Sequence, residues 1–404
     1  MKRKWTSGLL VMLMLVLLCL SAWAQGDDEE VSITIYDQEG NVVAGEGAPA
    51  DVDGDGVPDP TPEPVEPVPT VDKTQAVYQA DGSILLTLSF TGDVTIGSNL
   101  QSDGASIFEK ELKKQNGNVD FPFRNVKELF QADDLTMVNF EGTLTSAQKN
   151  PDKSDYSFLF RADPSYVSML PDNGIDTVSY ENNHADDMGA EGLEETKATL
   201  TAAGVTYASE DEPAVMTVKG VKIGSLAYQT FGGRHEELME KVPKDIAALR
   251  EQGCEVVIVS YHWGAEKDYA PNDNQVKLGR ATIDAGADLV VGHHSHRINP
   301  IEYYNGKYIC YSLGNFSFAG NSKPDDMSTY IFQLQLRVKD GQAASEQFRI
   351  VPCRISSRTD YNDFTPTPYT KDTNVEAVLR VLRENGKKLE YAVEEYPLKW
   401  IGEE

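Results

Sequence analysis

Cysteine is scarce in this chain, and its few copies are widely spaced. Four cysteines occur among 404 residues, and the three that follow the N-terminal stretch are Cys254, Cys310 and Cys353. This spacing excludes a dense disulfide framework and matches no cysteine metal-binding motif. Cys310 and Cys353 both lie in strand-like runs, so they either pair in an oxidising compartment or, as we favour, stay as buried free thiols.

Positive charge is also in short supply. The chain has 36 lysine and arginine residues against 64 aspartate and glutamate residues, which gives a formal net charge of −28 at pH 7. An acidic polypeptide repels phosphate backbones and anionic headgroups. We therefore expect neither nucleic acid nor anionic lipid among its partners.

The N-terminal apolar run is short for a membrane span, because it covers only Leu9 to Leu20. It follows a basic start and precedes Ala22-Trp23-Ala24, which predicts a secretory signal peptide over residues 1–24. A retained membrane anchor is the alternative, and Cys19 is a poor lipid-attachment site because a bulky leucine precedes it. Cleavage removes three positive charges and no negative ones, taking the formal charge from −28 to −31. We expect a secreted or cell-envelope protein.

Two short segments precede the main part of the chain. Residues 25–50 contain the alternating run VSITIYDQEGNVV, which predicts a small β-hairpin. Residues 51–80 are acidic and rich in proline, as in an extended linker. Aspartates recur there at the spacing of a calcium loop: Asp51, Asp53, Asp55 and Asp59. Because an EF-hand needs a glutamate where Pro62 stands, a weak calcium site and a solvated linker both remain open.

Strand-like and helical patterns alternate from residue 81 to residue 360. Strands are predicted at 83–90, 135–140, 175–180, 221–229, 254–263 and 287–292, and helices at 123–131, 192–204, 235–253 and 274–286. Asn-Gly and Asp-Gly turns later in this region predict two hairpins. The alternation predicts a layered α/β sandwich, followed by a helical C-terminal extension over residues 361–404.

Polar side chains of metal-ligand type come shortly after the predicted strands. They form five groups: Asp93; Asn139 and Glu141; Asn182, Asn183 and His184; His262 and Glu266; and His293, His294 and His296. Each group alone is typical of a turn or a capped loop. However, these groups hold five of the six histidines, and strand ends of a layered sheet converge at one edge. We therefore predict one shared site, whose nitrogen and oxygen donors suit a divalent cation such as Mn²⁺, Zn²⁺ or Fe²⁺.

A series of motifs between Leu85 and Phe318 resembles that of the CapA family, named for bacterial poly-γ-glutamate capsule synthesis. The motifs are TGDVTIGSN, NFEGTLT, NNHADDMGAEGLEET, YHWGAEKDYAPNDNQ and GHHSHRINPIEYYNGKYICYSLGNF. The family is similar in fold to calcineurin-like metallophosphatases. The resemblance implies an α/β four-layer sandwich, in which helices flank central mixed β-sheets and metal ligands lie at strand ends.

The resemblance also implies roles for individual residues. The metal ligands would be Asp93, Glu141, Asn183, His262, His294 and His296. Asn183 and His184 would be catalytic, with His184 as a general acid or phosphate-contacting group. Residues that support the ligands or contact substrate would be Asn139, Asn182, Asp187, Glu266, His293, Ser312 and Asn315. Thr95 stands where the metallophosphatase motif Asp-X-His has its histidine, so we expect one metal, with a weakened two-metal site as the alternative.

Three functions remain open on this evidence. The first is a CapA-like envelope protein that acts in the biosynthesis, export or attachment of poly-γ-glutamate or a similar anionic capsule polymer, alongside capsule-synthesis membrane proteins. The second is a secreted metal-dependent hydrolase of small phosphoester or amide substrates. The third is a ligand-binding module without catalysis. A shared metal site is compatible with all three, since a fold does not determine a function.

Overall fold

The computed structural model describes residues 73–100, 107–148, 150, 153 and 158–403, and the backbone of residues 35–36 and 42–44. By its internal contacts the chain divides into two units, residues 1–64 and 65–404. In the first unit, β1 (Ile35–Tyr36) and β2 (Val42–Ala44) pair antiparallel, within the run that predicts a hairpin. The expected signal peptide (residues 1–24) and the calcium-loop aspartates (Asp51, Asp53, Asp55 and Asp59) lie outside the described residues.

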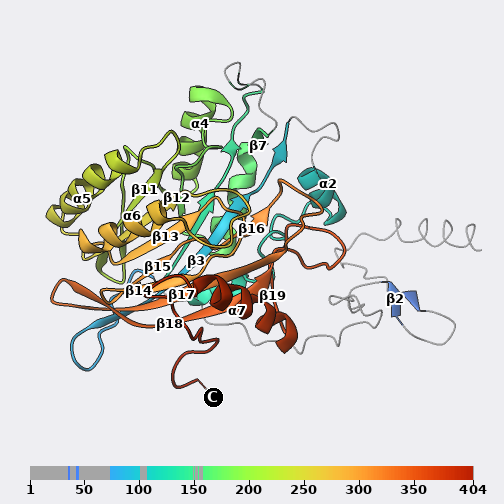
Figure 1. Ribbon diagram of the computed structural model, residues 1–404. Helices are drawn as coiled ribbons and strands as arrows, with labels where there is room; N and C mark the ends of the chain where they lie inside the picture. Colours follow the sequence, from blue (N-terminus) through green and yellow to red (C-terminus); the bar gives the residue numbers. More distant parts are fainter. Residues whose placement is uncertain are drawn as a thin grey trace, which may run out of the picture. The chain divides into compact units, whose positions relative to one another are not determined.

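The second unit is built around two β-sheets (Figure 1). The first sheet has six strands in the order β10-β11-β12-β13-β15-β14. Their bounds are β10 (Ala214–Val218), β11 (Val221–Gln229), β12 (Val256–His262), β13 (Leu289–His293), β14 (Ile301–Tyr304) and β15 (Lys307–Cys310). Strands β11, β12, β13 and β15 run parallel, and β14 and β15 form a hairpin at the predicted Asn-Gly turn.

The second sheet has the order β19-β18-β17-β3-β5-β8-β9, and β16 pairs with β3 in addition. Its strands are β3 (Ile84–Thr95), β5 (Leu135–Phe140), β8 (Thr177–Ser179), β9 (Thr206–Ala208), β16 (Asn315–Phe318), β17 (Ser328–Lys339), β18 (Gln342–Arg354) and β19 (Thr367–Pro368). Strands β3, β5, β8 and β9 are parallel, and β17 and β18 form the hairpin predicted at the Asp-Gly turn. A small third sheet consists of β4 (Ser98–Asn99), β7 (Phe160–Ala162) and β6 (Thr143–Leu144).

Helices cover the outer face of each large sheet. Helices α5 (His235–Glu251) and α6 (Asp273–Asp284) pack on the six-stranded sheet. On the other sheet lie α2 (Ile107–Lys114), α3 (Lys127–Ala132) and α4 (Gly189–Ala202), with the 3₁₀ helices η3 (Pro164–Met169) and η4 (Pro171–Asn173) nearby. The sequence does not predict α2.

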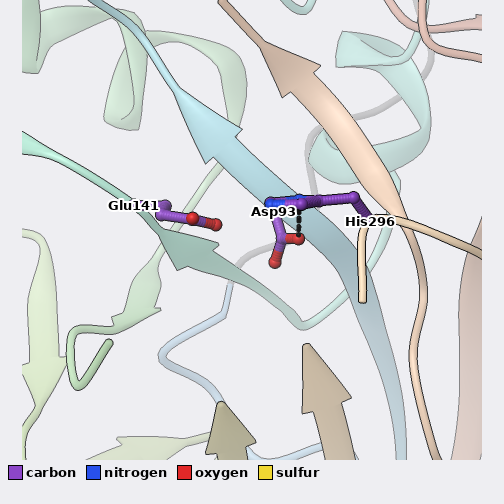
Figure 2. Close-up of side chains that lie close together, drawn as sticks. All are labelled: Asp93, Glu141 and His296. Carbon is purple, nitrogen blue, oxygen red and sulfur yellow. Dashed lines mark hydrogen bonds and ion pairs between the residues drawn. The ribbon is translucent and has the colours of Figure 1, made fainter. Parts of the chain in front are cut away.

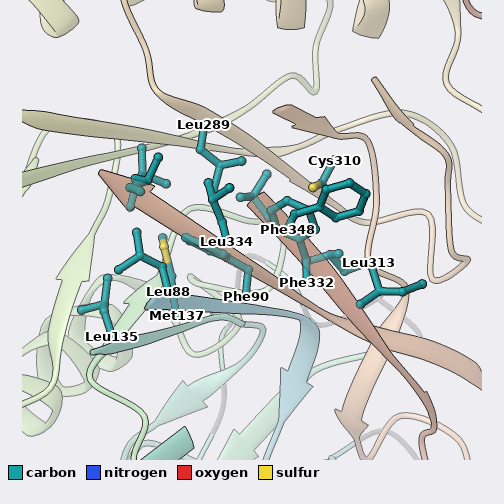
Figure 3. Close-up of a cluster of buried hydrophobic side chains, with 14 of the residues drawn as sticks. Leu88, Phe90, Leu135, Met137, Leu289, Cys310, Leu313, Phe332, Leu334 and Phe348 are labelled. Atoms are coloured by element: carbon teal, nitrogen blue, oxygen red, sulfur yellow. The ribbon is translucent and has the colours of Figure 1, made fainter. Parts of the chain in front are cut away.

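Apolar side chains from both sheets meet between them and form the main core (Figure 3). Phe90 of β3, Leu334 of β17 and Leu289 of β13 are all fully buried there. Along β12, Ile258 faces this core, whereas its neighbours Val257 and Val259 pack with the helices, as strand alternation requires. The order of layers is therefore helix, sheet, sheet, helix, and the expected four-layer α/β sandwich is confirmed.

The C-terminal residues pack into the same core. Helix α7 (Asp372–Gly386) contributes Val378, Leu379 and Leu382, and Tyr396 joins them further along the chain. The backbone of Val393 donates a hydrogen bond to the carbonyl oxygen of Ile301, at 2.8 Å. Within the segment expected as a helical extension, residues 361–404, only residues 372–386 form an α-helix, and the segment packs as part of the sandwich.

Cys254, Cys310 and Cys353 are free and buried, as favoured from the sequence, and burial raises the pKa of each thiol. None of the helices in the described part of the chain combines the length and apolar character that a membrane crossing requires.

One buried carboxylate lies far from the carboxyl ends of the strands. Asp133 follows α3 at the start of β5, and its side chain accepts a hydrogen bond from the Thr136 hydroxyl at 2.7 Å. Lys73 Nζ is 3.6 Å from Asp133 but 2.6 Å from Asp176, so Asp176 is its closer partner. Burial raises the pKa of Asp133 to about 7 from an ordinary 3.8.

This shift predicts a pH-dependent stability. Between pH 4 and pH 7 the folded chain binds more protons at Asp133 than the unfolded chain, so its contribution to stability falls as the pH rises through this range. Asp133→Asn removes this loss and should raise the free energy of unfolding by up to about 4 kcal/mol at pH 8, with no gain at pH 4. Urea titrations at both pH values measure this free energy of unfolding.

Asp134→Asn is the matched control and should destabilise the protein, because Asp134 pairs with Lys219 at 2.5 Å. Equal effects of the two variants on stability would contradict the account.

Candidate metal centre

The predicted site residues lie at the carboxyl ends of parallel strands from both large sheets. Asp93 lies near the C-terminal end of β3, Glu141 directly follows β5, and His262 is the last residue of β12. The segment 182–184 comes shortly after β8, and the segment 293–296 begins at the end of β13. Because parallel strands end at the same edge, residues from five distant parts of the chain share one location.

Asp93 is fully buried and lies at the centre of this group. One carboxylate oxygen accepts a hydrogen bond from Asn139 Nδ2 at 2.8 Å, and the other lies 3.1 Å from His296 Nδ1. His293 Nδ1 is 3.6 Å from the first oxygen. Burial alone would raise the pKa of Asp93, but the hydrogen bond and charge of His296 outweigh it and hold that pKa below its ordinary value. Asp93 is therefore an anion at neutral pH.

Glu141 is the second buried carboxylate, and neither of its oxygens has a hydrogen-bond partner. Burial and then the negative charge of Asp93 raise the pKa of Glu141 to about 7. A buried carboxylate without a donor is unfavourable unless a cation compensates it. The two free oxygens of Glu141 thus fit a bound cation at this position.

Three donor atoms converge there, as Figure 2 shows. One atom each of Asp93, Glu141 and His296 lie within 4.8 Å of one another, a mixed oxygen and nitrogen set that suits a divalent transition metal. The pKa of His296 is raised to about 9, because the charges of Glu141 and Asp93 outweigh the effect of burial, so a metal ion bound by this imidazole would have to displace its proton. Asn315 orients this imidazole, with its side-chain oxygen 2.9 Å from His296 Nδ1.

The other three predicted ligands form an adjoining group. His262 Nε2 lies 2.7 Å from the Asn183 side-chain oxygen and 3.1 Å from His294 Nδ1. Asn139 Nδ2 is 3.5 Å from His262 Nδ1, so Asn139 connects this group to Asp93. Burial lowers the pKa of His262 well below its ordinary value and that of His294 to about 4. Both imidazoles are therefore neutral at physiological pH, the form in which histidine binds metals.

His184 also lies close to the converging donors. Its Nδ1 is 2.7 Å from Asp187 Oδ2, which also accepts the backbone N–H of Phe160 at 2.7 Å. Its Nε2 lies 3.7 Å from a Glu141 oxygen. Asn182 fixes the loop by accepting from the His184 backbone at 3.0 Å and donating to the Phe140 carbonyl at 2.8 Å. Asp187 thus sets the ring orientation and directs Nε2 at the centre.

The remaining predicted residues lie around the histidine loop. The Ser295 hydroxyl hydrogen-bonds the Ser312 hydroxyl at 3.0 Å and the Arg297 carbonyl at 2.9 Å, so Ser312 supports the loop. His293 is buried, and its Nδ1 has no hydrogen-bond partner. Glu266 is exposed, but its charge raises the pKa of His296 together with the carboxylates named above.

Sequence reasoning missed an aromatic wall around the imidazoles. Phe231 lies edge-on to His294 with ring centroids 4.6 Å apart, and Phe160 and Phe318 contact His184 and His296 at 4.6 and 4.9 Å. Phe231 follows β11 in a glycine-containing turn, and no spacing signal distinguishes it from an ordinary apolar residue. These rings add apolar surface beside the histidines, and a less polar environment strengthens the local electrostatic interactions.

Thr95, which replaces the expected histidine, has a structural contact instead. Its hydroxyl donates a 2.6 Å hydrogen bond to the backbone carbonyl of Glu141, and the side chain is buried. It therefore holds the backbone that carries the second carboxylate.

The sequence is similar to a family of bacterial proteins and to two of its relatives in Bacillus species. The family described as Bacterial capsule synthesis protein PGA_cap matches residues 87–319. The chain is 32% identical to the PGA biosynthesis protein CapA of Bacillus subtilis over 308 residues, which cover 72% of this chain and 75% of the relative. It is 28% identical to the capsule biosynthesis protein CapA of Bacillus anthracis over 326 residues, covering 75% of this chain and 74% of the relative. The resemblance seen in the motifs is confirmed.

Solved structures show a weaker likeness. The calcineurin-like phosphoesterase YfkN from Bacillus subtilis shares 15% sequence identity at a TM-score of 0.39, covering 76% of this chain and all of that one. At that TM-score the likeness carries no argument about the site.

The contact of Thr95 predicts a stability effect at the centre. Thr95→Val keeps the side-chain volume but leaves the Glu141 carbonyl without this donor, which should cost about 1–2 kcal/mol of unfolding free energy. Thr95→Ser retains the hydroxyl and should lose less. Denaturant titration of the three proteins measures the difference, and a valine variant as stable as the wild type would show that the hydrogen bond contributes nothing.

Proposed function

The chain belongs to the bacterial capsule synthesis protein family PGA_cap, and from that premise we propose that it acts in the biosynthesis of poly-γ-glutamate or a similar anionic capsule polymer, through a divalent-metal centre. The names of its relatives in two Bacillus species support the choice of this polymer as the product of the pathway in which the chain acts. The sequence motif at residues 1–24 supports export to the cell envelope, where such a polymer is assembled or attached.

The main support for a bound metal is the buried carboxylate of Glu141, whose oxygens have no hydrogen-bond partner. Asp93, Glu141 and His296 would hold one Mn²⁺, Zn²⁺ or Fe²⁺ ion, and the neutral His262 and His294 with the Asn183 oxygen lie beside them as further donors. This set contains three types of ligand atom that first-row metals accept (carboxylate oxygen, carboxamide oxygen and imidazole nitrogen), and no thiolate. The calcium site in residues 51–59 is a separate proposal that rests on aspartate spacing alone.

A divalent ion bound here would supply Lewis acidity to a substrate carbonyl or phosphoryl oxygen. The chain itself supplies the proton chemistry. His184 presents Nε2 to the centre while Asp187 accepts from Nδ1, so His184 is placed to protonate a leaving group. Phe160, Phe231 and Phe318 add apolar surface at the same place. This arrangement suits cleavage or transfer at the γ-amide bonds of the polymer.

The metal assignment is tested by metal analysis of purified protein and variants. Wild-type protein should carry about one equivalent of a divalent transition metal, and the double variant His294→Ala/His296→Ala should lose it, because water replaces imidazole poorly. His184→Ala should keep the metal, while turnover or ligand binding falls by roughly 10²-fold, as expected for a lost general acid.

His235→Ala is the control, since that residue begins α5 outside every motif. Retention of the metal in the double variant, or its loss in the His235 control, would contradict a centre at these residues.

A further inference from the structure

A cavity lies beside the metal centre. Its volume is about 530 Å³, within the range of small-molecule sites. Asn182, Asn183 and Phe231 line it. Asn183 lies 2.7 Å from His262 Nε2, and the ring of Phe231 lies 4.6 Å from that of His294, so the cavity adjoins the group formed by these two histidines. A substrate with one group bound in the cavity can therefore extend from there to the metal centre.

The cavity wall carries charges of both signs, with an excess of acid. Five carboxylates and two lysines line it. Most of these groups are paired within the protein: Glu210 binds Arg234 at 2.5 Å, and Lys197 binds Glu212 at 2.5 Å. Lys153 lies 2.5 Å from Asp186. A lining of this kind repels a polyanion along its length and attracts a cationic end.

Glu181 is a lining carboxylate whose hydrogen-bond partners are neutral groups. It follows β8 and directly precedes the Asn182-Asn183-His184 loop. Its side-chain oxygens accept hydrogen bonds from Gln229 Nε2 at 2.8 Å and from the Glu210 backbone at 3.1 Å. Among the described residues, no lysine, arginine or histidine forms an ion pair with it. A carboxylate that is held by neutral donors and faces a cavity is suited to bind a ligand cation.

We propose that this cavity binds the ammonium group of the substrate, with Glu181 as its counter-ion. The proposal rests on the proposed function and names the part of the polymer that is recognised. In a γ-linked glutamate chain every internal nitrogen is a neutral amide, and the free amino terminus is the one cationic group. The cavity thus selects the amino-terminal end of the polymer and places the adjoining bonds toward the centre.

Acetylation of the amino terminus tests this directly, because it removes the positive charge and leaves the rest of the oligomer unchanged. A short γ-linked glutamate oligomer and its N-acetylated form are titrated calorimetrically into the purified full-length protein at about 0.15 M salt, where long-range charge effects are screened. The acetylated oligomer should bind roughly tenfold more weakly, as expected for a lost charge-assisted hydrogen bond. Glu181→Gln should bind both oligomers equally, since the glutamine keeps an acceptor for Gln229 without the charge.

The matched control is Glu251→Gln, which makes the same change of charge on an exposed residue. Glu251 ends α5, about 24 Å along the helix axis from the end near Arg234 and the cavity. It should keep the preference for the free amino terminus. Loss of the preference in both variants would assign it to net charge and overturn the proposal.

The failure of the cavity proposal and of the polymer role can be distinguished. Equal binding of the two oligomers by the wild type, or a preference that survives Glu181→Gln, overturns the ammonium site and leaves the polymer role intact. If neither oligomer binds, the polymer assignment fails, and titration with glycinamide, a small ammonium probe, decides the cavity alone. If glycinamide binds the wild type but not Glu181→Gln, the ammonium site is upheld. If glycinamide does not bind at all, the ammonium site is overturned together with the polymer role.

Discussion

Two carboxylates share one buried location in this protein, and the rest of the centre depends on how their charges are compensated. Asp93 and Glu141 are both fully buried, and two like charges in a poorly solvated place cannot both be stable without a partner. Asp93 has its partners in His296 and Asn139. Neither oxygen of Glu141 has a hydrogen-bond partner, and burial, followed by the negative charge of Asp93, raises its pKa to about 7. This imbalance is the physical reason to place a cation between them.

The fold maintains that location through close backbone approach. A side chain at Gly92 would place its Cβ 1.8 Å from the Gly314 carbonyl oxygen, so only glycine lets β3 approach the segment that carries Asn315. The Asp93 backbone N–H donates to that same carbonyl at 2.9 Å, and Asp93 and Asn315 are partners in the pairing of β3 with β16. The carboxylate and the residue that orients His296 are thereby held in register.

Much of this could be predicted from sequence, because it depends on local patterns. Apolar runs followed by polar residues predicted the strands that carry Asp93, Glu141, His262 and the histidine loop, and the strand ends do meet at one edge.

What could not be predicted depends on tertiary contacts. His294 and His296 have left-handed backbones, with φ of 91° and 53°, which local propensity disfavours for histidine. The directions of these two imidazoles depend on that backbone geometry. The aromatic wall depends on Phe231, whose position after β11 gives no local signal, and the C-terminal Tyr396 joins a core formed by strands far away in the chain.

Anomalous X-ray diffraction from crystals of the purified protein, recorded on both sides of the absorption edge of its metal, tests the central claim most directly. The account predicts an anomalous peak between the carboxylates of Asp93 and Glu141 and the imidazole of His296, within bonding distance of all three. A peak elsewhere in the molecule, or a well-ordered centre in which Glu141 is instead compensated by a protein donor and no anomalous signal is present, would contradict it.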